Sequence, residues 1–273
     1  MSNQPMVSIV TVCYNAEKSI EHALKSVLSQ TYQDFEYIVK DGASTDQTMQ
    51  IIENYRDKFA AKGIRFVVVS EKDSGIYDAM NRAVQLCSGT WINFMNADDR
   101  FYDEHVLEQI FGQNQYETSH ILYGDTLEME YGEYYFYCKN LNLIEERMPF
   151  SHQSTFARRE VLLQYPFDLN YKIAADYDFL LTTYQAGLTF TDVNTIVSVV
   201  EKEGVSSLSL YDSFVQAVEL HKNHGIVNFT EKQYKRKLLY ARIKQFGMDF
   251  FPNWLKYLIR RYQRLIRKQK RVM

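Results

Sequence analysis

Four short apolar runs in the first 95 residues alternate with segments of helical periodicity, and this alternation restricts the fold more than any other feature. The runs cover residues 7–13, 35–39, 65–69 and 91–95 and are rich in β-branched and aromatic side chains. Between them, apolar residues recur three and four positions apart, as on one face of a helix. Strands and helices that alternate in this way form a parallel sheet with right-handed crossovers. We therefore predict an α/β fold with a mostly parallel sheet flanked by helices.

The second half of the chain is less regular. Residues 121–138 alternate apolar and polar side chains around Gly132, which predicts a β-hairpin. Further periodicity predicts helices near Arg159 and after Ala174, a strand over 196–200, and helices over 211–224 and 231–246. We predict a catalytic domain over residues 1–210 and a C-terminal helical extension over residues 211–273.

Each of the four N-terminal strands is followed by a polar loop. The carboxyl ends of parallel strands lie at one edge of a sheet and border its ligand crevice, so these loops should meet there. Their side chains are Asn15 and Glu17 after the first strand, Asp41 after the second, Asp73 after the third, and Asp98 and Asp99 after the fourth. The sequence therefore predicts one polar crevice rather than scattered acids.

The adjacent carboxylates Asp98 and Asp99 follow the buried run 91–95. Oxygen ligands suit a hard divalent cation such as Mg²⁺ or Mn²⁺, and such an ion could neutralise a diphosphate. The alternative is that the two acids cap a helix that begins near Asp103, where negative charge is favoured. These residues alone leave both interpretations open.

Five segments, in this order and spacing, resemble the family 2 glycosyltransferases with the GT-A fold: residues 8–15, 41–46, 75–81, 96–99 and 175–178. The resemblance covers about residues 6–210 and is strongest to bacterial enzymes that extend lipid-linked surface polysaccharides. It implies an inverting transfer of a sugar from a nucleotide-sugar donor, expected to be a UDP-sugar. The implied acceptor is a hydroxyl of a lipid-linked saccharide.

The resemblance also implies residues of the donor site. Asp41 matches an acid that accepts a hydrogen bond from the base, and its alternative is a turn over Gly42. Asp73 and Asn81 match polar groups that face the ribose and the donor sugar, while Arg82 is either a diphosphate contact or part of a solvated helix face. The expected donor-binding residues are Thr11, Tyr14, Asn15, Glu17, Asp41, Asp73, Gly75, Asn81, Arg82, Asn96 and Ala97.

The same resemblance implies the reacting groups. Asp98 matches the second acid of the family's D-x-D motif, but Asn96 stands in place of the first, which predicts weaker binding of Mn²⁺ or Mg²⁺. Asp176 matches the general base that takes a proton from the acceptor hydroxyl. Asp178 is the alternative base, although two residues along a helix point in different directions. The expected metal ligands are Asp98, Asp99 and His152, with an ordinary loop histidine as the alternative for His152.

Positive charge gathers at the C-terminus. Residues from Thr230 onward include 14 lysines and arginines against two acids, although the whole chain has a net charge of −3. Apolar residues between Trp254 and Ile266 recur at helical spacing, which predicts an amphipathic helix on an anionic membrane surface. The alternative is a helix packed on its own domain or in a homodimer. A nucleic-acid partner is disfavoured because the rest of the chain is acidic.

Hydropathy, cysteine content and the lack of a dinucleotide motif restrict the class of protein further. The sequence contains no run of 18 apolar residues, so no membrane-spanning helix is predicted. The three cysteines lack the spacing of metal ligands, which suits reduced thiols. We therefore expect a cytoplasmic protein at the inner face of the cell membrane. A nucleotidyltransferase and a non-catalytic nucleotide- or sugar-binding module are the alternative functions. A dinucleotide-dependent oxidoreductase is disfavoured, because no G-x-G-x-x-G follows the first strand.

Overall fold

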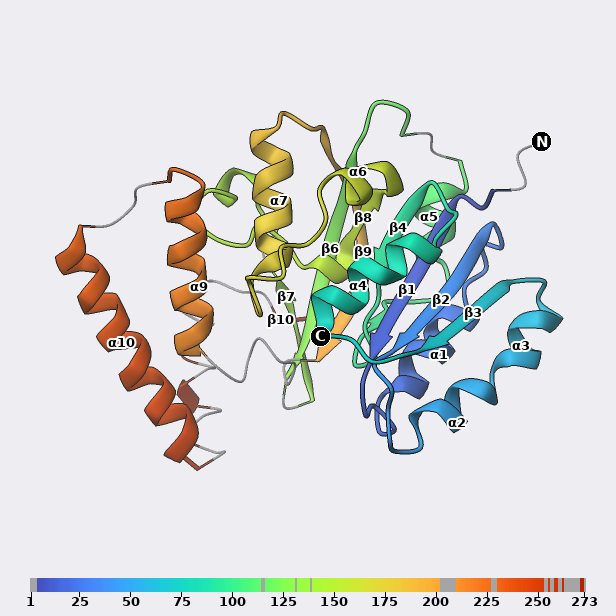
Figure 1. Ribbon diagram of the computed structural model, residues 1–273, viewed down its shortest axis with the longest axis horizontal. Coiled ribbons are helices and arrows are strands. Elements are labelled where there is room, and N and C mark those ends of the chain that lie inside the picture. Colours follow the sequence, from blue (N-terminus) through green and yellow to red (C-terminus); the bar gives the residue numbers. More distant parts are fainter. Residues whose placement is uncertain are drawn as a thin grey trace.

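The computed structural model describes residues 4–113, 116–130, 132–137, 139–201, 210–226, 230–252, 255, 258–259, 262 and 271–272. A mixed β-sheet with strand order β10-β7-β6-β8-β4-β1-β2-β3 forms its centre (Figure 1). The four predicted N-terminal strands are β1 (Val7–Cys13), β2 (Phe35–Asp41), β3 (Arg65–Ser70) and β4 (Trp91–Phe94). They pair in parallel, and every residue of β1, β2 and β4 is buried. The predicted α/β fold is confirmed.

Helices cover both faces of this sheet and bury two separate apolar cores. The helices of the first face are α1 (Ile20–Leu28), α2 (Thr48–Glu53), α3 (Arg56–Ala61) and α5 (Val106–Phe111). Those of the second face are α4 (Ile76–Leu86), α6 (Arg159–Gln164) and α7 (Ala175–Gln185). The helical spacing of the apolar residues therefore places each helix on the sheet, as expected for amphipathic elements.

The other half of the sheet is mixed. The predicted hairpin is β6 (Ile121–Glu130) and β7 (Glu133–Tyr137), with Gly132 at a φ of 75° between them. Strand β8 (Thr155–Arg158) lies antiparallel between β4 and β6 and was not predicted. Strand β9 (Phe190–Glu201) begins six residues before the predicted strand and pairs with β6 and the short β5 (Arg100–Phe101).

Two helices form the C-terminal layer in Figure 1: α9 (Leu210–Asn223) beside α7, and α10 (Glu231–Phe250) on its outer side. A capping box of Thr230 and Gln233 begins α10. Short strand β10 (Arg271–Val272) then pairs with β7. Most of the predicted tail helix lies outside the described residues. Among the helices that the structure describes, none is long and apolar enough to cross a bilayer.

Candidate active site

A cavity of about 1530 Å³ opens at the carboxyl ends of the parallel strands. Ligand pockets typically measure roughly 300–1,000 Å³, so the space suits a donor together with part of an acceptor. Of the residues predicted from the sequence, those that border it are Tyr14, Asn15, Glu17, Asp73, Gly75, Asn96, Ala97, Asp98, Asp99, His152 and Asp176. The predicted meeting of the strand-end loops in one crevice is therefore what the structure shows.

The loop after β4 presents two acids in different environments. Asp98 is exposed and borders the cavity, whereas Asp99 is buried and accepts a hydrogen bond of 2.8 Å from Nε2 of Gln153. Burial raises the pKa of Asp99 to about 7, and the Gln153 hydrogen bond opposes this shift. Helix α5 begins at Val106, directly after His105, so the alternative that these acids cap a helix is wrong.

Oxygen atoms suited to a divalent cation lie on this loop. Asp98 offers an exposed carboxylate, and Oδ1 of Asn96 is buried with no hydrogen-bond partner among the described residues. Within the described ranges, no three His, Cys, Asp or Glu side chains are grouped closely enough to hold an ion by themselves. A site with few protein ligands suits Mg²⁺-like ions, which are often completed by substrate phosphates and water. The residues present therefore fit such an ion.

A chain of hydrogen bonds links this loop to α7. Nδ2 of Asn96 lies 3.1 Å from Nε2 of His152, and Nδ1 of His152 lies 3.0 Å from Oδ2 of Asp176. Because an amide nitrogen only donates, Nε2 accepts and Nδ1–H donates to Asp176 in this orientation. Burial lowers the pKa of His152, but the hydrogen bond and charge of Asp176 outweigh it, and the net direction is upward.

The remaining oxygen of Asp176 is also held. Oδ1 accepts hydrogen bonds from the Tyr77 hydroxyl at 3.1 Å and from the backbone N–H of Tyr177 at 2.9 Å. Tyr77 belongs to the first turn of α4, so two distant segments fix one carboxylate at the cavity wall. The sequence analysis gave Tyr77 no function, although it lies inside a segment quoted for the resemblance.

Asp178 points away from the cavity. Its Oδ1 lies 2.8 Å from Nε2 of His224, beyond the end of α9. Burial raises the pKa of Asp178, and the hydrogen bond with His224 opposes the shift. The structure thus places Asp176, and not Asp178, beside the predicted donor residues.

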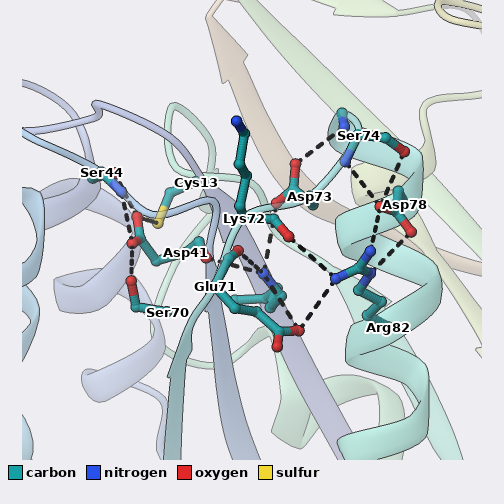
Figure 2. A network of polar contacts seen from close by, with 12 residues as sticks. Cys13, Asp41, Ser44, Ser70, Glu71, Lys72, Asp73, Ser74, Asp78 and Arg82 are labelled. Atoms are coloured by element: carbon teal, nitrogen blue, oxygen red, sulfur yellow. Dashed lines mark hydrogen bonds and ion pairs between the residues drawn. The ribbon is translucent and has the colours of Figure 1, made fainter.

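Asp41 has the turn geometry that was its alternative interpretation. Its buried carboxylate accepts hydrogen bonds from the backbone N–H and hydroxyl of Ser44 and from the hydroxyl of Ser70 (Figure 2). Next to it, a Cβ on Gly42 would lie 3.1 Å from Oδ2 of Asp73 and 3.3 Å from Cδ2 of Tyr14. Glycine at position 42 therefore lets Asp73 and Tyr14 approach the backbone at the cavity edge.

Three further predicted donor residues do not border the cavity. Thr11 donates to the carbonyl of Met95 at 2.6 Å inside the sheet. Asn81 pairs both amide atoms with the backbone of Phe167, at 2.8 and 2.9 Å. Arg82 lies on a solvated helix face. The predicted ligand contacts of these residues gain no support from the geometry.

Polar residues that the sequence analysis missed also border the cavity. All but one come from the antiparallel half of the sheet and from the loops around it, where no parallel strand end marks them. These residues are Asp46, Glu128, Glu130, Tyr137, Glu146, Arg147, Gln153, Lys172 and Glu201. The exception is Asp46, which lies in the loop after β2 and ends the segment 41–46 quoted for the resemblance.

Strand-end acids around one cavity of an α/β sheet, with a further carboxylate on the same cavity, agree with the site that the resemblance to GT-A sugar transferases implies. A family model described as glycosyl transferase family 2 matches residues 8–161, which is more than half of the chain, and the chain belongs to this family. It is thus a glycosyltransferase that uses a nucleotide-sugar donor.

Its relatives include bacterial biosynthetic enzymes. A PGL/p-HBAD biosynthesis glycosyltransferase of Mycobacterium tuberculosis is 30% identical over 226 residues, which are 81% of this chain and 87% of the relative. The chondroitin synthase of Escherichia coli is 38% identical over 95 residues, which are 35% of this chain and 13% of that protein.

Solved structures share the fold. TarS of Staphylococcus aureus in complex with UDP-GlcNAc aligns with a TM-score of 0.64 at 21% identity over 89% of this chain and 73% of that one. The chain spans 44% of a longer TarS structure. The mannosyltransferase PcManGT of Pyrobaculum calidifontis, with GDP-Man and Mn²⁺, has a TM-score of 0.64 at 18% identity, over 88% of this chain and 70% of that one.

Proposed function

We propose that the protein is an inverting, metal-dependent glycosyltransferase that moves a sugar from a UDP-sugar to a hydroxyl of a lipid-linked saccharide. The single observation that carries this proposal is the placement of Asp98 and Asp176 on one cavity. The loop that carries Asp98 is linked to Asp176 by hydrogen bonds through Asn96 and His152. A nucleotidyltransferase or a binding module has no evident use for both carboxylates in this arrangement.

Asp176 is the proposed general base. The acceptor oxygen bonds to the anomeric carbon and loses its proton to Asp176, while the bond from that carbon to the diphosphate oxygen breaks. One displacement of this kind inverts the anomeric configuration and needs no covalent sugar–enzyme intermediate. The hydrogen bonds from Tyr77 and His152 fix the direction of the carboxylate before the acceptor arrives. A positioned base contributes roughly 10²- to 10⁴-fold in rate.

Asp98 and Oδ1 of Asn96 would hold Mn²⁺ or Mg²⁺. When bound, such an ion supplies positive charge against the negative charge that develops on a leaving diphosphate. Mn²⁺ is part of the complexes of PcManGT and of the glucosyl-3-phosphoglycerate synthase of M. tuberculosis, which supports the assignment. Because Asn96 is uncharged, we expect the ion to bind more weakly than at two carboxylates.

A thermal-shift panel tests which nucleotide-sugar is the donor. UDP-, GDP- and dTDP-sugars are compared in the presence of Mn²⁺, since a ligand that binds only the native state raises the melting temperature. We expect the largest rise with UDP-sugars, in line with the TarS complex with UDP-GlcNAc. Stabilisation by none of these donors, or a larger rise with nucleoside triphosphates, would contradict the proposal.

The proposed lipid-linked acceptor agrees with the far wall of the cavity. Helix α10 and the residues after it contribute Tyr240, Ile243, Gly247 and Phe251 to this wall, which is more apolar than the wall around Asp98 and Asp176. An apolar wall beside the reacting groups suits an acceptor whose sugar is attached to a hydrophobic carrier.

The outer side of α10 supports peripheral contact with an anionic membrane. Leu239, Phe246 and Phe250 lie seven and four residues apart on this helix, and each of them is more than half exposed. The first turns of the helix carry Lys232, Lys235, Arg236 and Lys237. Basic turns next to an apolar stripe suit lipid phosphates and acyl chains, respectively.

Replacement of Phe246 and Phe250 by Glu is expected to lower the affinity for phosphatidylglycerol vesicles at least about tenfold, because two inserted apolar side chains become charged. Vesicle co-sedimentation measures this loss. Leu163→Glu changes an exposed apolar residue of α6 and is the matched control, with unchanged binding expected. Unchanged binding of the double variant would contradict the membrane contact. Conversion of a wild-type dimer into a monomer would assign the stripe to a homodimer instead.

A further inference from the structure

A lysine ammonium is buried beneath the donor side of the cavity. Lys40 is the penultimate residue of β2, and its side chain is 0% exposed. Side chains alternate along a strand, so Lys40 points to the same face as Ile38, whose side chain is part of the core beneath α4. Burial of an ammonium ion is unfavourable unless partners replace its hydration.

The partners of Lys40 all belong to the ends of β2 and β3. Nζ donates to the carbonyl oxygen of Asp41 at 3.0 Å and to that of Glu71 at 2.7 Å. It also lies 3.6 Å from Oδ2 of Asp73, whose side chain is only 13% exposed. The two carbonyls accept hydrogen bonds from the ammonium group, while the carboxylates of Asp73, at 3.6 Å, and of Glu71, at 4.0 Å, form longer ion pairs with it.

Asp73 is thereby held from two sides. One oxygen lies near the Lys40 ammonium, and Oδ1 accepts a hydrogen bond from the backbone N–H of Gly75 at 3.0 Å. Both Asp73 and Gly75 border the cavity, while Lys40 does not. The lysine thus touches the residues that shape the cavity without reaching the space that a ligand would fill.

We propose that Lys40 is a positioning residue of the donor site: its ammonium fixes the carboxylate of Asp73 and the loop 71–75 before the nucleotide binds. This inference rests on the proposed function in that it takes the cavity at Asp73 to be the donor side. A methionine of similar length would fill the same buried space without the desolvation of a charge. The retained charge is therefore explained by the two carbonyls and the carboxylate that it orders.

Arg82 contacts the same loop from outside. Its guanidinium donates to the carbonyl of Lys72 at 3.2 Å and lies 3.5 Å from Oε1 of Glu71 (Figure 2). The Arg82 side chain is 45% exposed and does not border the cavity. Exposed ion pairs contribute little to stability, so Arg82 offers a matched control for the removal of a cation from this loop.

The test compares Lys40→Met, Asp73→Asn, the double variant and Arg82→Met. UDP affinity with Mn²⁺ is measured by calorimetry, and exchange of the amide hydrogens of residues 71–75 by mass spectrometry. We expect Lys40→Met to raise the Kd of UDP about tenfold, the size of one lost charge-assisted contact. The exchange of the loop amides should rise at least about tenfold, since local opening becomes easier. Arg82→Met should stay within about twofold of wild type in affinity.

The double variant decides whether Lys40 acts through Asp73. If it does, Lys40→Met adds little to the loss that Asp73→Asn already causes. Losses that multiply, or a Lys40→Met variant with unchanged affinity and unchanged exchange, would overturn the inference. If Lys40→Met does not fold, Lys40→Gln retains a donor without the charge and takes its place in the same measurements. A wild-type protein that binds none of UDP, GDP and dTDP would contradict the proposed function, and the exchange of residues 71–75 would then decide on Lys40 alone.

Discussion

Asp176→Asn is expected to lower the turnover number about a thousandfold, within the range that a positioned general base supplies. The amide has nearly the shape of the carboxylate and keeps an oxygen for the Tyr77 hydroxyl, but it cannot take a proton from the acceptor. The Kd of UDP should stay within about twofold of wild type, because Asp176 acts on the acceptor. Turnover is measured by UDP release with a saccharide acceptor, and Kd by calorimetry.

Asp178→Asn is the matched control on the same helix. Its side chain faces His224 instead of the cavity, so we expect nearly normal turnover and a moderately lower melting temperature. A normal Asp176→Asn enzyme together with an inactive Asp178→Asn enzyme would reverse the assignment of the base. A higher pH is not expected to restore the activity of Asp176→Asn, because the amide that replaces the carboxylate cannot take up a proton at any pH used.

Asp98→Asn is expected to reduce transfer by about 10²-fold or more and to abolish the additional thermal stabilisation that Mn²⁺ gives in the presence of UDP. Asp98 is the exposed carboxylate of the loop after β4, and its neighbour Asn96 offers only a neutral oxygen. Without Asp98, the loop retains a neutral amide and the buried Asp99, which is held by Gln153. Both turnover and the metal-dependent melting temperature are measured.

Chelation provides the independent control for the metal. EDTA should remove the activity of the wild-type enzyme, and added Mn²⁺ or Mg²⁺ should restore it. Full activity that persists in EDTA would contradict metal dependence, whatever Asp98→Asn does. An Asp98→Asn enzyme that loses transfer but keeps the Mn²⁺-dependent stabilisation would show that Asp98 contacts the substrate and not the ion.

The parallel half of the fold was predictable because two simple rules act there. Buried parallel strands read as continuous apolar runs, and their carboxyl ends share one edge of the sheet. These rules place Asn15, Asp73 and Asp98 on one crevice, and all three border the cavity. The two-residue offset along a helix predicts that Asp176 and Asp178 point in different directions, and of these two residues the structure places Asp176 at the cavity and Asp178 against His224.

The remaining features depend on contacts between distant segments. Strand β8 has four residues, too few for a periodic signal, and its place between β4 and β6 follows only from pairing. Asn81 is a polar residue of a helix near the crevice, and nothing local shows that the backbone of Phe167 uses both of its amide atoms. The buried environment of Lys40 was not predictable for the same reason, because its partners Glu71 and Asp73 belong to the loop after another strand.

The cavity draws its walls from different parts of the chain. The first hundred residues supply the side around Asp73 and Asp98, residues between 126 and 201 add His152 and Asp176, and α9 and α10 supply a further wall. Chimeras that exchange the last 64 residues between relatives would alter one wall while the strand-end loops keep their own supporting contacts. Related enzymes could thus differ in the glycans they make through changes in their C-terminal helices, while the strand-end loops of the nucleotide-binding half stay the same.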